Sequence, residues 1–582
     1  MPGRWADQPV WHALALDTPL SLLQLWQDWR QTAQVTDRLF CTAVLPEAPS
    51  ASALAQLAQS LTLPEDLARA LAQAWQGLMP GVHRLTLEGG RVQWTLCIGP
   101  ARALLRELDT PVHSITLTHW PDDEAHGLHT LKALARLCQT GTTLRIASAE
   151  DRQDALRQCG FEALAQEQAH ADKSVLQAVY APRWTPRSKL RQPSGLPRQA
   201  LVLGAGLSGS ATAYSLAQRG WHVTVLDAGA APGAGASGLP AGLTAPHVSP
   251  DDHVLSRITR AGVRATVQRA AALLHSGQDW GPSGVLEHRV EGKRSLPTGD
   301  AWPDAGHAWS TPASAAQIAK AGLPPEAQAL WHGLAAWVRP RPLVAAQLAH
   351  PRIQVRWQSR VERLAQQDGH WNALDAQGHA LAQAPVLVIA GGYDTRALLQ
   401  AMATGPAPLP LNPLRGQISM GPLSSLPSDT LAQLPPFPVN GHGSFITGVP
   451  LPDGSGPGWY LGSTFERACP EALLREGDHA ANHARLATLL PGLSEPLREA
   501  FAPAQVQGWA GLRCTLPDRL PAVGALDAER WPGLHICAGM GARGISLSVL
   551  AGELIAAQLE GEPLPLAPSL ATYLAAQRFG AR

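Results

Sequence analysis

The stretch that most restricts the fold of this chain runs from Leu201 to Gly229 and reads LVLGAGLSGSATAYSLAQRGWHVTVLDAG. Directly after an apolar strand, predicted at 199–203, come the three glycines of a GxGxxG pattern: Gly204, Gly206 and Gly209. In a dinucleotide-binding unit the first glycine permits a tight turn, the second lets the backbone approach a pyrophosphate, and the third lets the helix pack closely. A second strand, predicted at 222–226, ends in Asp227, eighteen residues past the third glycine, where a carboxylate can accept the ribose hydroxyls. We therefore predict a strand–helix–strand unit that binds a dinucleotide.

The first motif does not separate NAD from FAD, and three later stretches favour FAD. GAGASGLPAG (233–242) is a loop rich in small residues, and APVLVIAGGYDT (384–395) is an apolar strand that ends in small residues. A second GxGxxG follows a strand within GLHICAGMGARGISLSVL (533–550), and the helix after it can stabilise negative charge on a reduced flavin. In this order the stretches resemble the glycine oxidase/D-amino acid oxidase (DAO) class of FAD enzymes. The resemblance implies FAD contacts from Gly235, Ser237, Gly238, Ala390, Gly391, Gly539, Gly541 and Gly544.

One arginine stands where that class binds its substrate. WAGLRCTLPDRLPAVG (509–524) resembles the substrate-arginine segment of the class, with Arg513 at the arginine position. A guanidinium matches a carboxylate with two parallel hydrogen bonds, which would aim the adjacent methylene at the flavin. Arg543, within the second glycine motif, is a further candidate that could contact either the substrate or the flavin. The alternative for each is a surface or ion-paired arginine.

The residues before this unit form a separate α/β segment that ends in a linker. LSLLQLWQDWRQ (20–31) has helical spacing, RVQWTLCIG and SITLTHW alternate like strands, and 127–148 is typical of helix, turn and strand. Residues 181–198 hold four prolines, one glycine, five basic residues and no acid, which favours an extended tether. In the alternative interpretation the basic side chains contact phosphates: Arg183, Arg187, Lys189, Arg191 and Arg198.

An α/β segment, a basic linker and a DAO-class FAD unit, in this order, resemble the bifunctional tRNA 5-methylaminomethyl-2-thiouridine biosynthesis (MnmC) family over most of the chain. MPGVHRLTLEGGRVQWTLCIG (79–99) and GTTLRIASAEDRQDALRQCGFE (141–162) are similar to its N-terminal domain, and GASG, RGQIS, YLGSTF and RLPAVG to its FAD part. The resemblance implies that the FAD part oxidatively removes the carboxymethyl group from a modified wobble uridine of tRNA. A domain that uses S-adenosylmethionine (SAM) would then methylate the exposed amine. An unstacked base would enter a pocket, and the candidates to stack on it are Tyr460, Phe445 and Trp459, whose alternative role is core packing.

The N-terminal segment departs from that family where the methyltransferase chemistry is expected. A glycine-rich loop should follow its first strand, but WHALALDTPLSLLQLW (11–26) has no glycine, and bulky residues there would obstruct SAM. An acidic motif resembling DGFxP should end a later strand, but SITLTHWPDDE (114–124) offers only Asp122 and Asp123, in a different frame. The chain also begins late compared with the family. We therefore interpret this segment as a degenerate methyltransferase domain, kept to cover the FAD domain or hold tRNA, and SAM as a doubtful cofactor.

The predicted fold class is α/β throughout. A truncated Rossmann-like methyltransferase-type domain (1–180) and the linker (181–198) precede an FAD-dependent oxidoreductase domain (199–582), a two-layer α/β nucleotide domain with a mixed-sheet substrate subdomain. The 46 basic and 46 acidic residues balance, and seven scattered cysteines without a CxxC pair predict reduced thiols and no metal site. No signal-peptide pattern and no apolar stretch near the roughly 20 residues of a membrane span are found, so we expect a cytoplasmic protein without a membrane partner.

Three alternatives stay open at this point. The chain could be fully bifunctional, with both oxidoreductase and methyltransferase activity. It could be a free glycine or amino-acid oxidase with an unrelated N-terminal extension, which would need no basic surface. It could also be a flavin-stabilised scaffold that binds RNA without turnover.

Overall fold

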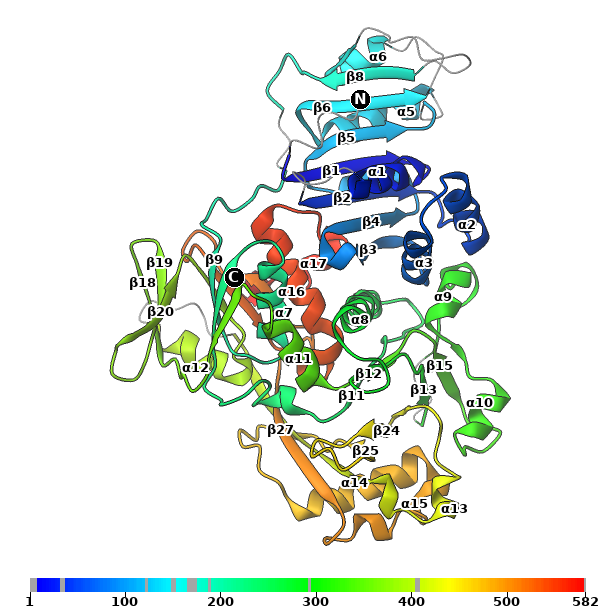
Figure 1. The fold of residues 1–582 in the computed structure, drawn as a ribbon, viewed down its shortest axis with the longest axis vertical. Helices are drawn as coiled ribbons and strands as arrows, with labels where there is room; N and C mark the ends of the chain where they lie inside the picture. Colours follow the sequence, from blue (N-terminus) through cyan, green and yellow to red (C-terminus); the bar gives the residue numbers. More distant parts are fainter. Residues whose placement is uncertain are drawn as a thin grey trace. The chain divides into compact units, whose positions relative to one another are not determined.

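The computed structural model describes residues 8–31, 37–120, 124–147, 153–164, 175–186, 190–290, 295–402 and 409–579. The chain forms two compact units, which Figure 1 shows with the chain coloured along its length. The first comprises Met1–Ser194 together with Ala557–Ala571, and the second comprises Gly195–Ala556 together with Thr572–Arg582. Both are α/β, as predicted.

The first unit is built on one eight-stranded sheet, whose strands lie in the order β3-β4-β2-β1-β5-β6-β8-β7. Their bounds are β1 Val10–Leu16, β2 Arg38–Leu45, β3 Gly81–Leu87, β4 Val92–Ile98, β5 Val112–Leu117, β6 Cys138–Ala147, β7 Phe161–Ala163 and β8 Val175–Tyr180. The pairs β4–β2, β2–β1, β1–β5 and β5–β6 are parallel. Numbered along the chain, these five strands follow the order 3-2-1-4-5 of a doubly wound fold. In such a fold ligands bind outside the carboxyl ends of the strands where the order reverses, here between β1 and β5.

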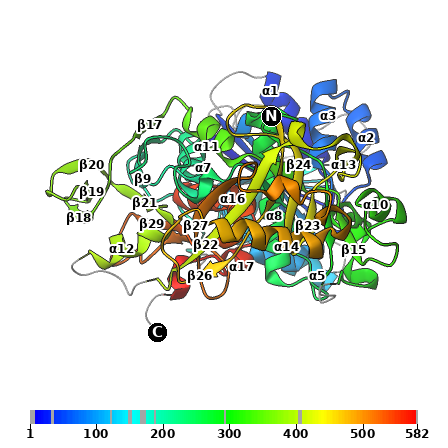
Figure 2. The ribbon, with the colours of Figure 1, turned by 90° about the horizontal axis from the view of Figure 1, so that it is seen from below.

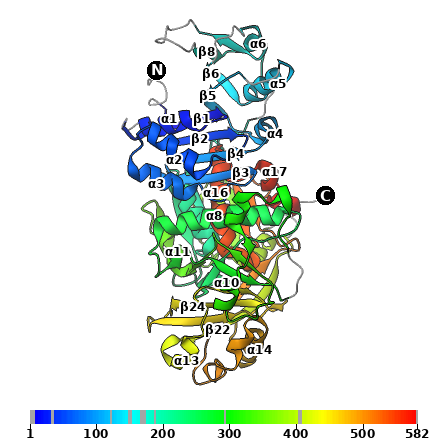
Figure 3. The ribbon, with the colours of Figure 1, turned by 90° about the vertical axis from the view of Figure 1, so that its right-hand side faces the viewer.

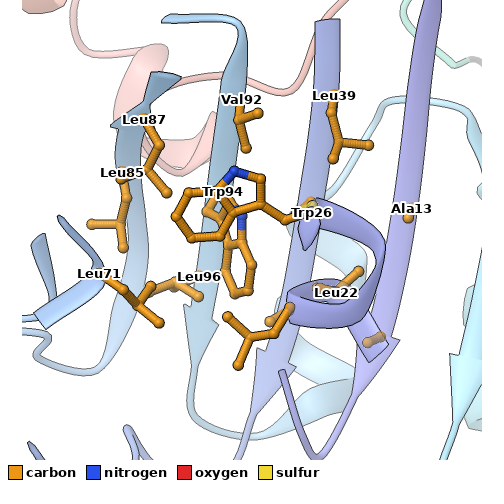
Figure 4. Close-up of a cluster of buried hydrophobic side chains, with 14 of the residues drawn as sticks. Ala13, Leu22, Trp26, Leu39, Leu71, Leu85, Leu87, Val92, Trp94 and Leu96 are labelled. Carbon is orange, nitrogen blue, oxygen red and sulfur yellow. The ribbon is translucent and has the colours of Figure 1, made fainter. Parts of the chain in front are cut away.

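Helices cover both faces of this sheet. Figure 3 shows α1 (Leu20–Gln31), α2 (Ala51–Ser60) and α3 (Glu65–Ala74) on one face and α4 (Ala101–Glu107), α5 (Glu124–Ala135) and α6 (Gln153–Gln158) on the other. The core on the first face contains five buried tryptophans: Trp11, Trp26, Trp29, Trp75 and Trp94. Trp26 meets Trp94 edge to face at a centroid distance of 6.2 Å (Figure 4), and Trp75 meets Trp94 in the same way at 6.4 Å. Because both faces are covered, β2 and β4 are buried along their whole length, as expected for parallel strands.

A segment from near the C-terminus completes the first unit. Glu562 forms a buried ion pair with Arg38 of β2, and Arg84 of β3 donates to the Leu564 carbonyl at 3.1 Å. The Ser569 amide, in α17 (Pro568–Ala571), donates to the Glu107 carboxylate at 3.1 Å. The sequence contains no pattern that predicts this docking, because the two halves of each contact lie more than 400 residues apart.

The nucleotide part of the second unit is a six-stranded sheet in the order β17-β10-β9-β21-β29-β28. Its bounds are β9 Gln199–Leu203, β10 His222–Leu226, β17 Ile353–Arg356, β21 Val386–Ile389, β28 Ala522–Ala525 and β29 Leu534–Ala538. The predicted strand–helix–strand unit is confirmed, with α7 (Leu207–Ala217) between β9 and β10. One set of strand side chains, including Leu201 and Leu387, shares a core with Trp371 of a small three-stranded sheet, β18 (Arg363–Gln367), β19 (His370–Leu374) and β20 (Ala380–Ala384).

A nine-stranded mixed sheet forms the second layer of this unit. It comprises β13 Val285–His288, β14 Thr311–Pro312, β15 Ala329–His332, β22 Asn412–Pro422, β23 Val439–Gly441, β24 Gly443–Pro450, β25 Pro457–Gly462, β26 Glu466–Arg467 and β27 Gln507–Thr515. A third sheet joins β11 (Gly242–Thr244), β16 (Ala336–Val338) and β12 (Trp280–Gly281). The remaining helices are α8 Val254–Leu273, α9 Asp304–Trp309, α10 Ala315–Lys320, α11 Pro340–Leu348, α12 Thr395–Gln400, α13 Ser428–Leu431, α14 Glu476–Leu489, α15 Pro491–Ser494 and α16 Gly544–Glu560. The predicted mixed-sheet subdomain is thus present.

One helical stretch of the described residues, Gly541–Glu560, is long and apolar enough to cross a membrane. This differs from the sequence-based expectation that no apolar stretch approaches the length of a membrane span. However, 78% of its most apolar window is buried inside the fold, as in the core helix of a globular unit. Its high hydropathy is explained by that burial.

Candidate functional site

The first glycine motif packs against the end of strand β21. Gly204 has φ of +104°, and a β-carbon at this position would lie 2.7 Å from the Ala390 carbonyl oxygen and 3.2 Å from the Gly391 α-carbon. A β-carbon at Gly209 would lie 1.7 Å from the Gly204 carbonyl oxygen. The structure therefore brings these four predicted residues together, and only glycine allows α7 to approach β9 so closely.

The glycine- and serine-rich loop closes over the start of α7. The Ser237 hydroxyl accepts a hydrogen bond from the Leu207 amide at 2.9 Å, and a β-carbon at Gly206 would lie 2.9 Å from the same hydroxyl oxygen. The Gly238 amide donates to the Gly235 carbonyl at 2.9 Å, which holds the loop in a tight turn. The sequence predicted that this loop contacts the pyrophosphate, and it lies at the helix N-terminus, where phosphates bind.

Asp227 is positioned by two backbone amides at the end of β10. Its carboxylate accepts from the Ala205 amide at 2.5 Å and from the Gly229 amide at 2.7 Å, one bond to each oxygen. Each oxygen of an ionised carboxylate has a second lone pair. The predicted ribose contact is therefore compatible with the two bonds that orient the side chain.

The second glycine motif brings another helix start to the same place. Strand β29 leads through Gly539, which has φ of +82°, and Gly541, which has φ of +57°, into α16. A β-carbon at Gly544 would lie 3.6 Å from the Leu207 side chain, so α16 begins beside the start of α7. Two positive helix ends and two glycine turns thus converge on one region, and these residues fit an FAD, which carries a pyrophosphate and a ring that becomes anionic on reduction.

Arg513 lies on β27, whose partner strand β22 places Gly416 beside it. A β-carbon at Gly416 would lie 2.6 Å from Arg513 Nη1, so glycine makes the space that the guanidinium occupies. Nη2 donates to the Ser463 hydroxyl at 2.6 Å, and the guanidinium carbon lies 4.9 Å from the centroid of the Phe465 ring. Figure 2 shows β22, β26, β27 and α14 together in this part of the second unit.

The charge of Arg513 is not compensated within the described part of the chain. Nη1 is buried and has no hydrogen-bond partner, and no carboxylate of the described residues lies in ion-pair range of this guanidinium. Burial lowers the pKa of Arg513 to about 10. A buried cation with an unused donor is costly unless an anion binds to it, so the site is suited to a carboxylate.

Trp509 connects this arginine to the glycine- and serine-rich loop and was not predicted as a site residue. Residues 509, 511 and 513 share one face of β27, and a β-carbon at Gly511 would lie 2.2 Å from the Trp509 ring, which therefore covers that glycine. At its other end, the Trp509 indole nitrogen lies 3.4 Å from a β-carbon placed on Gly238. One strand thus spans from the predicted pyrophosphate loop to the buried guanidinium. The sequence does contain one sign of this: in WAGLRC, residues 509, 511 and 513 alternate, so in a strand their side chains point to the same face.

Arg341 of α11 was also missed by the sequence analysis. Its Nη2 lies 3.3 Å from a β-carbon placed on Gly238, and its Cγ lies 3.3 Å from one placed on Gly233. A cation beside a phosphate-binding loop suits a pyrophosphate. No local pattern predicts this residue as a site residue, because α11 begins at Pro340, 98 residues after the loop ends at Gly242.

Arg543 follows the second glycine motif, in the turn 541–543. A β-bridge between Thr515 and Met540 places this turn beside the end of β27, two residues beyond Arg513. The Arg543 amide donates to the Met540 carbonyl at 3.1 Å. Its assignment to substrate or to flavin stays a prediction.

The three aromatic candidates for base stacking belong to the core. Tyr460, Phe445 and Trp459 are buried, with exposed fractions of 2%, 1% and 0%. The alternative role of core packing is therefore confirmed for all three. The exposed aromatic of this region is Phe465, at 49%.

In the first unit the loop after β1 makes its own contacts at the switch point between β1 and β5. The loop after β1 holds Asp17 at φ of +69°, whose amide donates to the Val44 carbonyl at 2.9 Å. The Leu20 amide donates to the Thr18 hydroxyl at 3.2 Å, and Pro19 has no amide hydrogen. His119, beyond β5, lies 3.5 Å from the Asp17 carboxylate. Asp122 and Asp123 lie outside the described residues.

The basic linker is tied to the first unit at Arg191. Its amide donates to the Asp109 carbonyl at 2.7 Å, and its guanidinium forms an ion pair with the Asp109 carboxylate. Arg183 and Arg198 are exposed, and Arg187 and Lys189 lie outside the described residues. All seven cysteines are free, and the described residues contain no group of three or more histidines, cysteines or acids that could hold a metal.

Comparison with known proteins places this geometry in a family. Residues 199–558 match the family of FAD dependent oxidoreductases named DAO. The tRNA 5-methylaminomethyl-2-thiouridine biosynthesis bifunctional protein MnmC of Paracidovorax citrulli is 45% identical over 612 residues, which cover 100% of this chain and 94% of that protein. The protein of the same name from Ralstonia nicotianae is 34% identical and covers 100% of this chain and 91% of its own length.

Among solved structures, the L-proline dehydrogenase of P. horikoshii is similar with a TM-score of 0.51 and 15% identity. The alignment covers 67% of this chain and 98% of that one. At this identity the likeness shows the fold alone.

Proposed function

Since this chain belongs to the MnmC family of bifunctional tRNA modification proteins and carries its FAD-dependent oxidoreductase domain, we propose that it removes the carboxymethyl group from 5-carboxymethylaminomethyl-(2-thio)uridine at the tRNA wobble position. The observation that carries the proposal is the buried, unpaired Nη1 of Arg513. The substrate side chain, uridine–CH2–NH–CH2–COO⁻, ends in the carboxylate that this cation lacks. We expect the protein to act in the cytoplasm, on the anticodon loop.

In this proposal Arg513 binds the substrate carboxylate and Ser463 holds the guanidinium in place through the 2.6 Å hydrogen bond to Nη2. FAD, when bound, supplies the hydride acceptor. Gly416 and Gly511, the glycines of β22 and β27, make the space that the Arg513 guanidinium and the Trp509 ring occupy. A carboxylate bound to Arg513 would orient the adjacent methylene, between nitrogen and carboxylate, for reaction with the flavin. Loss of hydride from that methylene gives an imine, and its hydrolysis releases glyoxylate and leaves the aminomethyl uridine. No protein base is required if the amine binds neutral.

The cofactor contacts proposed from the sequence form one set around the two helix starts. Gly204, Gly206, Gly209, Gly235, Ser237, Gly238, Gly539, Gly541 and Gly544 would hold the pyrophosphate and flavin, with Ala390 and Gly391 beneath and Asp227 on the ribose. Arg341 would add a cation to the pyrophosphate. Arg543 would contact either the substrate or the flavin.

We further propose that methylation is lost in this chain. The loop after β1 has no glycine, and two of its amides are already bonded, to Val44 and Thr18. Asp17 and His119 contact each other at 3.5 Å beside the position where a doubly wound sheet binds its ligand. A nucleoside cofactor would have to displace these contacts, so SAM is expected to bind weakly or not at all.

Mass spectrometry of the wobble nucleoside tests both proposals. tRNA that carries carboxymethylaminomethyl-uridine is incubated with the protein, with and without SAM. We expect the aminomethyl form in both reactions. Methylaminomethyl-uridine in the SAM reaction would overturn the loss of methylation, and unchanged substrate in both would overturn the oxidative step.

A further inference from the structure

We infer that Phe465 is the surface on which the substrate nucleobase stacks while Arg513 holds the substrate carboxylate. The inference rests on the proposed function and names how the base is recognised. Neither the sequence motifs nor the comparisons assign a role to this residue.

The position of Phe465 is set by the same backbone that positions Arg513. Strand β25 ends at Gly462, and the next residue, Ser463, accepts the hydrogen bond from Arg513 Nη2 at 2.6 Å. Phe465 follows two residues later, with its ring centroid 4.9 Å from the Arg513 guanidinium carbon. A short segment therefore fixes both the carboxylate-binding group and an aromatic ring beside it.

The distance between Phe465 and the Arg513 guanidinium matches the length of the substrate side chain. Four bonds join the uracil ring to the carboxylate carbon, which span about 5 Å when extended, at roughly 1.3 Å per bond. A carboxylate bound to Arg513 thus leaves the base within reach of a ring that contacts the same guanidinium. The side chain of Phe465 is 49% exposed, so part of its surface is open to a stacking partner.

The local charge suits a nucleotide. Arg485 of α14 lies 5.8 Å from the Phe465 centroid, and its Nη1 lies 3.4 Å from His442 Nε2. Within the described residues no carboxylate forms an ion pair with either Arg485 or Arg513. A ring flanked by two uncompensated guanidinium groups is typical of sites that stack a base and bind its anionic groups. Arg485 would face the phosphate of the same nucleotide.

The surroundings of Phe465 are rigid, which a stacking surface needs. Buried Arg415 donates to the Asp478 carboxylate at 2.7 Å and lies 3.6 Å from Glu466, the neighbour of Phe465. Glu466 also pairs with Arg475 at 2.6 Å. These contacts tie the strand that follows Phe465 to the start of α14, so the ring projects from a braced segment. A merely structural phenylalanine would be expected in the core, as Phe445 is.

The test compares Phe465→Ala, Phe465→Leu and Phe465→Trp in the full-length holoprotein. The probe is an anticodon stem-loop RNA that carries carboxymethylaminomethyl-uridine, and the readout is the half-saturating RNA concentration for flavin reduction without oxygen. Tyr573→Ala is the matched control, because Tyr573 is also 49% exposed and lies on the 572–582 segment. N-methylglycine, which has the same carboxylate and amine but no base, is tested as a competitor.

We expect Phe465→Ala and Phe465→Leu to raise the half-saturating RNA concentration by roughly 5- to 100-fold, the range for loss of one stacked base. Phe465→Trp should restore it, and the control should leave it unchanged. The inhibition constant of N-methylglycine should stay the same in all variants. An equal loss for RNA and N-methylglycine, or no loss for either, would overturn the stacking role.

A failure of the proposed function gives a different result. In that case the wild-type flavin is not reduced by the modified RNA, before any Phe465 variant is compared, and the stacking role falls with it. Flavin reduction by wild-type protein together with an unchanged Phe465→Ala variant overturns the stacking role alone.

Discussion

The guanidinium of Arg513 lies between Gly416, Ser463 and Phe465, and no carboxylate of the described residues is in ion-pair range. Evolution of a stable core would favour a paired or apolar residue at such a position, since an unpaired buried charge costs free energy. A charge at such a position is typical of a group that meets its partner only when the ligand binds.

Arg513→Met should therefore separate activity from stability. Loss of one member of a buried charge pair costs about 2–5 kcal/mol, so kcat/KM should fall by roughly 30- to 4,000-fold. The melting temperature should stay the same or rise, because the substitution removes an uncompensated buried cation. Anaerobic flavin reduction and thermal unfolding measure the two effects. A melting temperature that falls together with activity would indicate a structural arginine.

At the scale of elements, the nucleotide part is held together by glycine contacts and one buried charge cluster. A β-carbon at Gly552 of α16 would lie 2.6 Å from the Ala211 backbone of α7, so these helices meet backbone to backbone. The next residue, Glu553, accepts a hydrogen bond from Ser215 of α7 at 2.7 Å. It also forms ion pairs with Arg219, just after α7, at 2.9 Å and with Arg269 of α8 at 2.8 Å. These contacts hold α7 and α16, whose starts face the predicted cofactor site, against each other.

Gly209→Ala should abolish flavin binding, because its β-carbon would lie 1.7 Å from the Gly204 carbonyl oxygen and force α7 away from β9. The absorbance of bound flavin in the purified protein measures this. Gly477→Ala in α14 is the control, since a β-carbon there meets nothing within 4 Å. Normal flavin content in Gly209→Ala would contradict the close packing seen at this turn.

The Glu553 cluster predicts how stability depends on pH. Burial alone would raise the pKa of Glu553, but Arg219 and Arg269 outweigh it and lower the pKa from 4.5 to about 2. The pKa is lower in the folded than in the unfolded state, so the stabilisation is fully present above about pH 4.5 and is lost as the pH falls towards 2.

Glu553→Gln tests that dependence. At pH 7 the free energy of unfolding of the variant should be lower than that of wild type by about 3–5 kcal/mol, because the substitution leaves two buried guanidinium groups without a carboxylate. The difference from wild type, followed by denaturant unfolding at a series of pH values, should shrink between pH 4.5 and 2. A constant difference over that range would show that Glu553 does not titrate as its surroundings indicate.

Across the whole chain, the first unit is completed by residues 557–571, which begin in the last turn of α16. Arg38 and Glu562 are 9% and 3% exposed at their side chains, so their pair is a buried one. Glu562→Ala should therefore lower stability by about 3–5 kcal/mol. Glu495→Ala, which breaks the exposed pair with Arg498, should cost no more than about 1 kcal/mol. Equal effects in unfolding measurements would mean that the Arg38–Glu562 pair stabilises the first unit no more than an exposed ion pair does.

Short sequence patterns are enough to predict the local units: the strand, glycines and helix from Gln199 to Ala217, the second glycine motif, and the arginine of WAGLRC. These follow from patterns of a few residues, because a tight turn or a close helix contact demands glycine at that place. The partners of each unit were decided only by the tertiary structure. Trp509, Arg341 and Phe465 acquire their positions from neighbours far away in the chain. The 557–571 segment contacts residues of the first unit that lie 462 or more residues earlier in the chain. Packing between two distant segments depends on the shape and charge of each of them. No short stretch of sequence contains the two segments together.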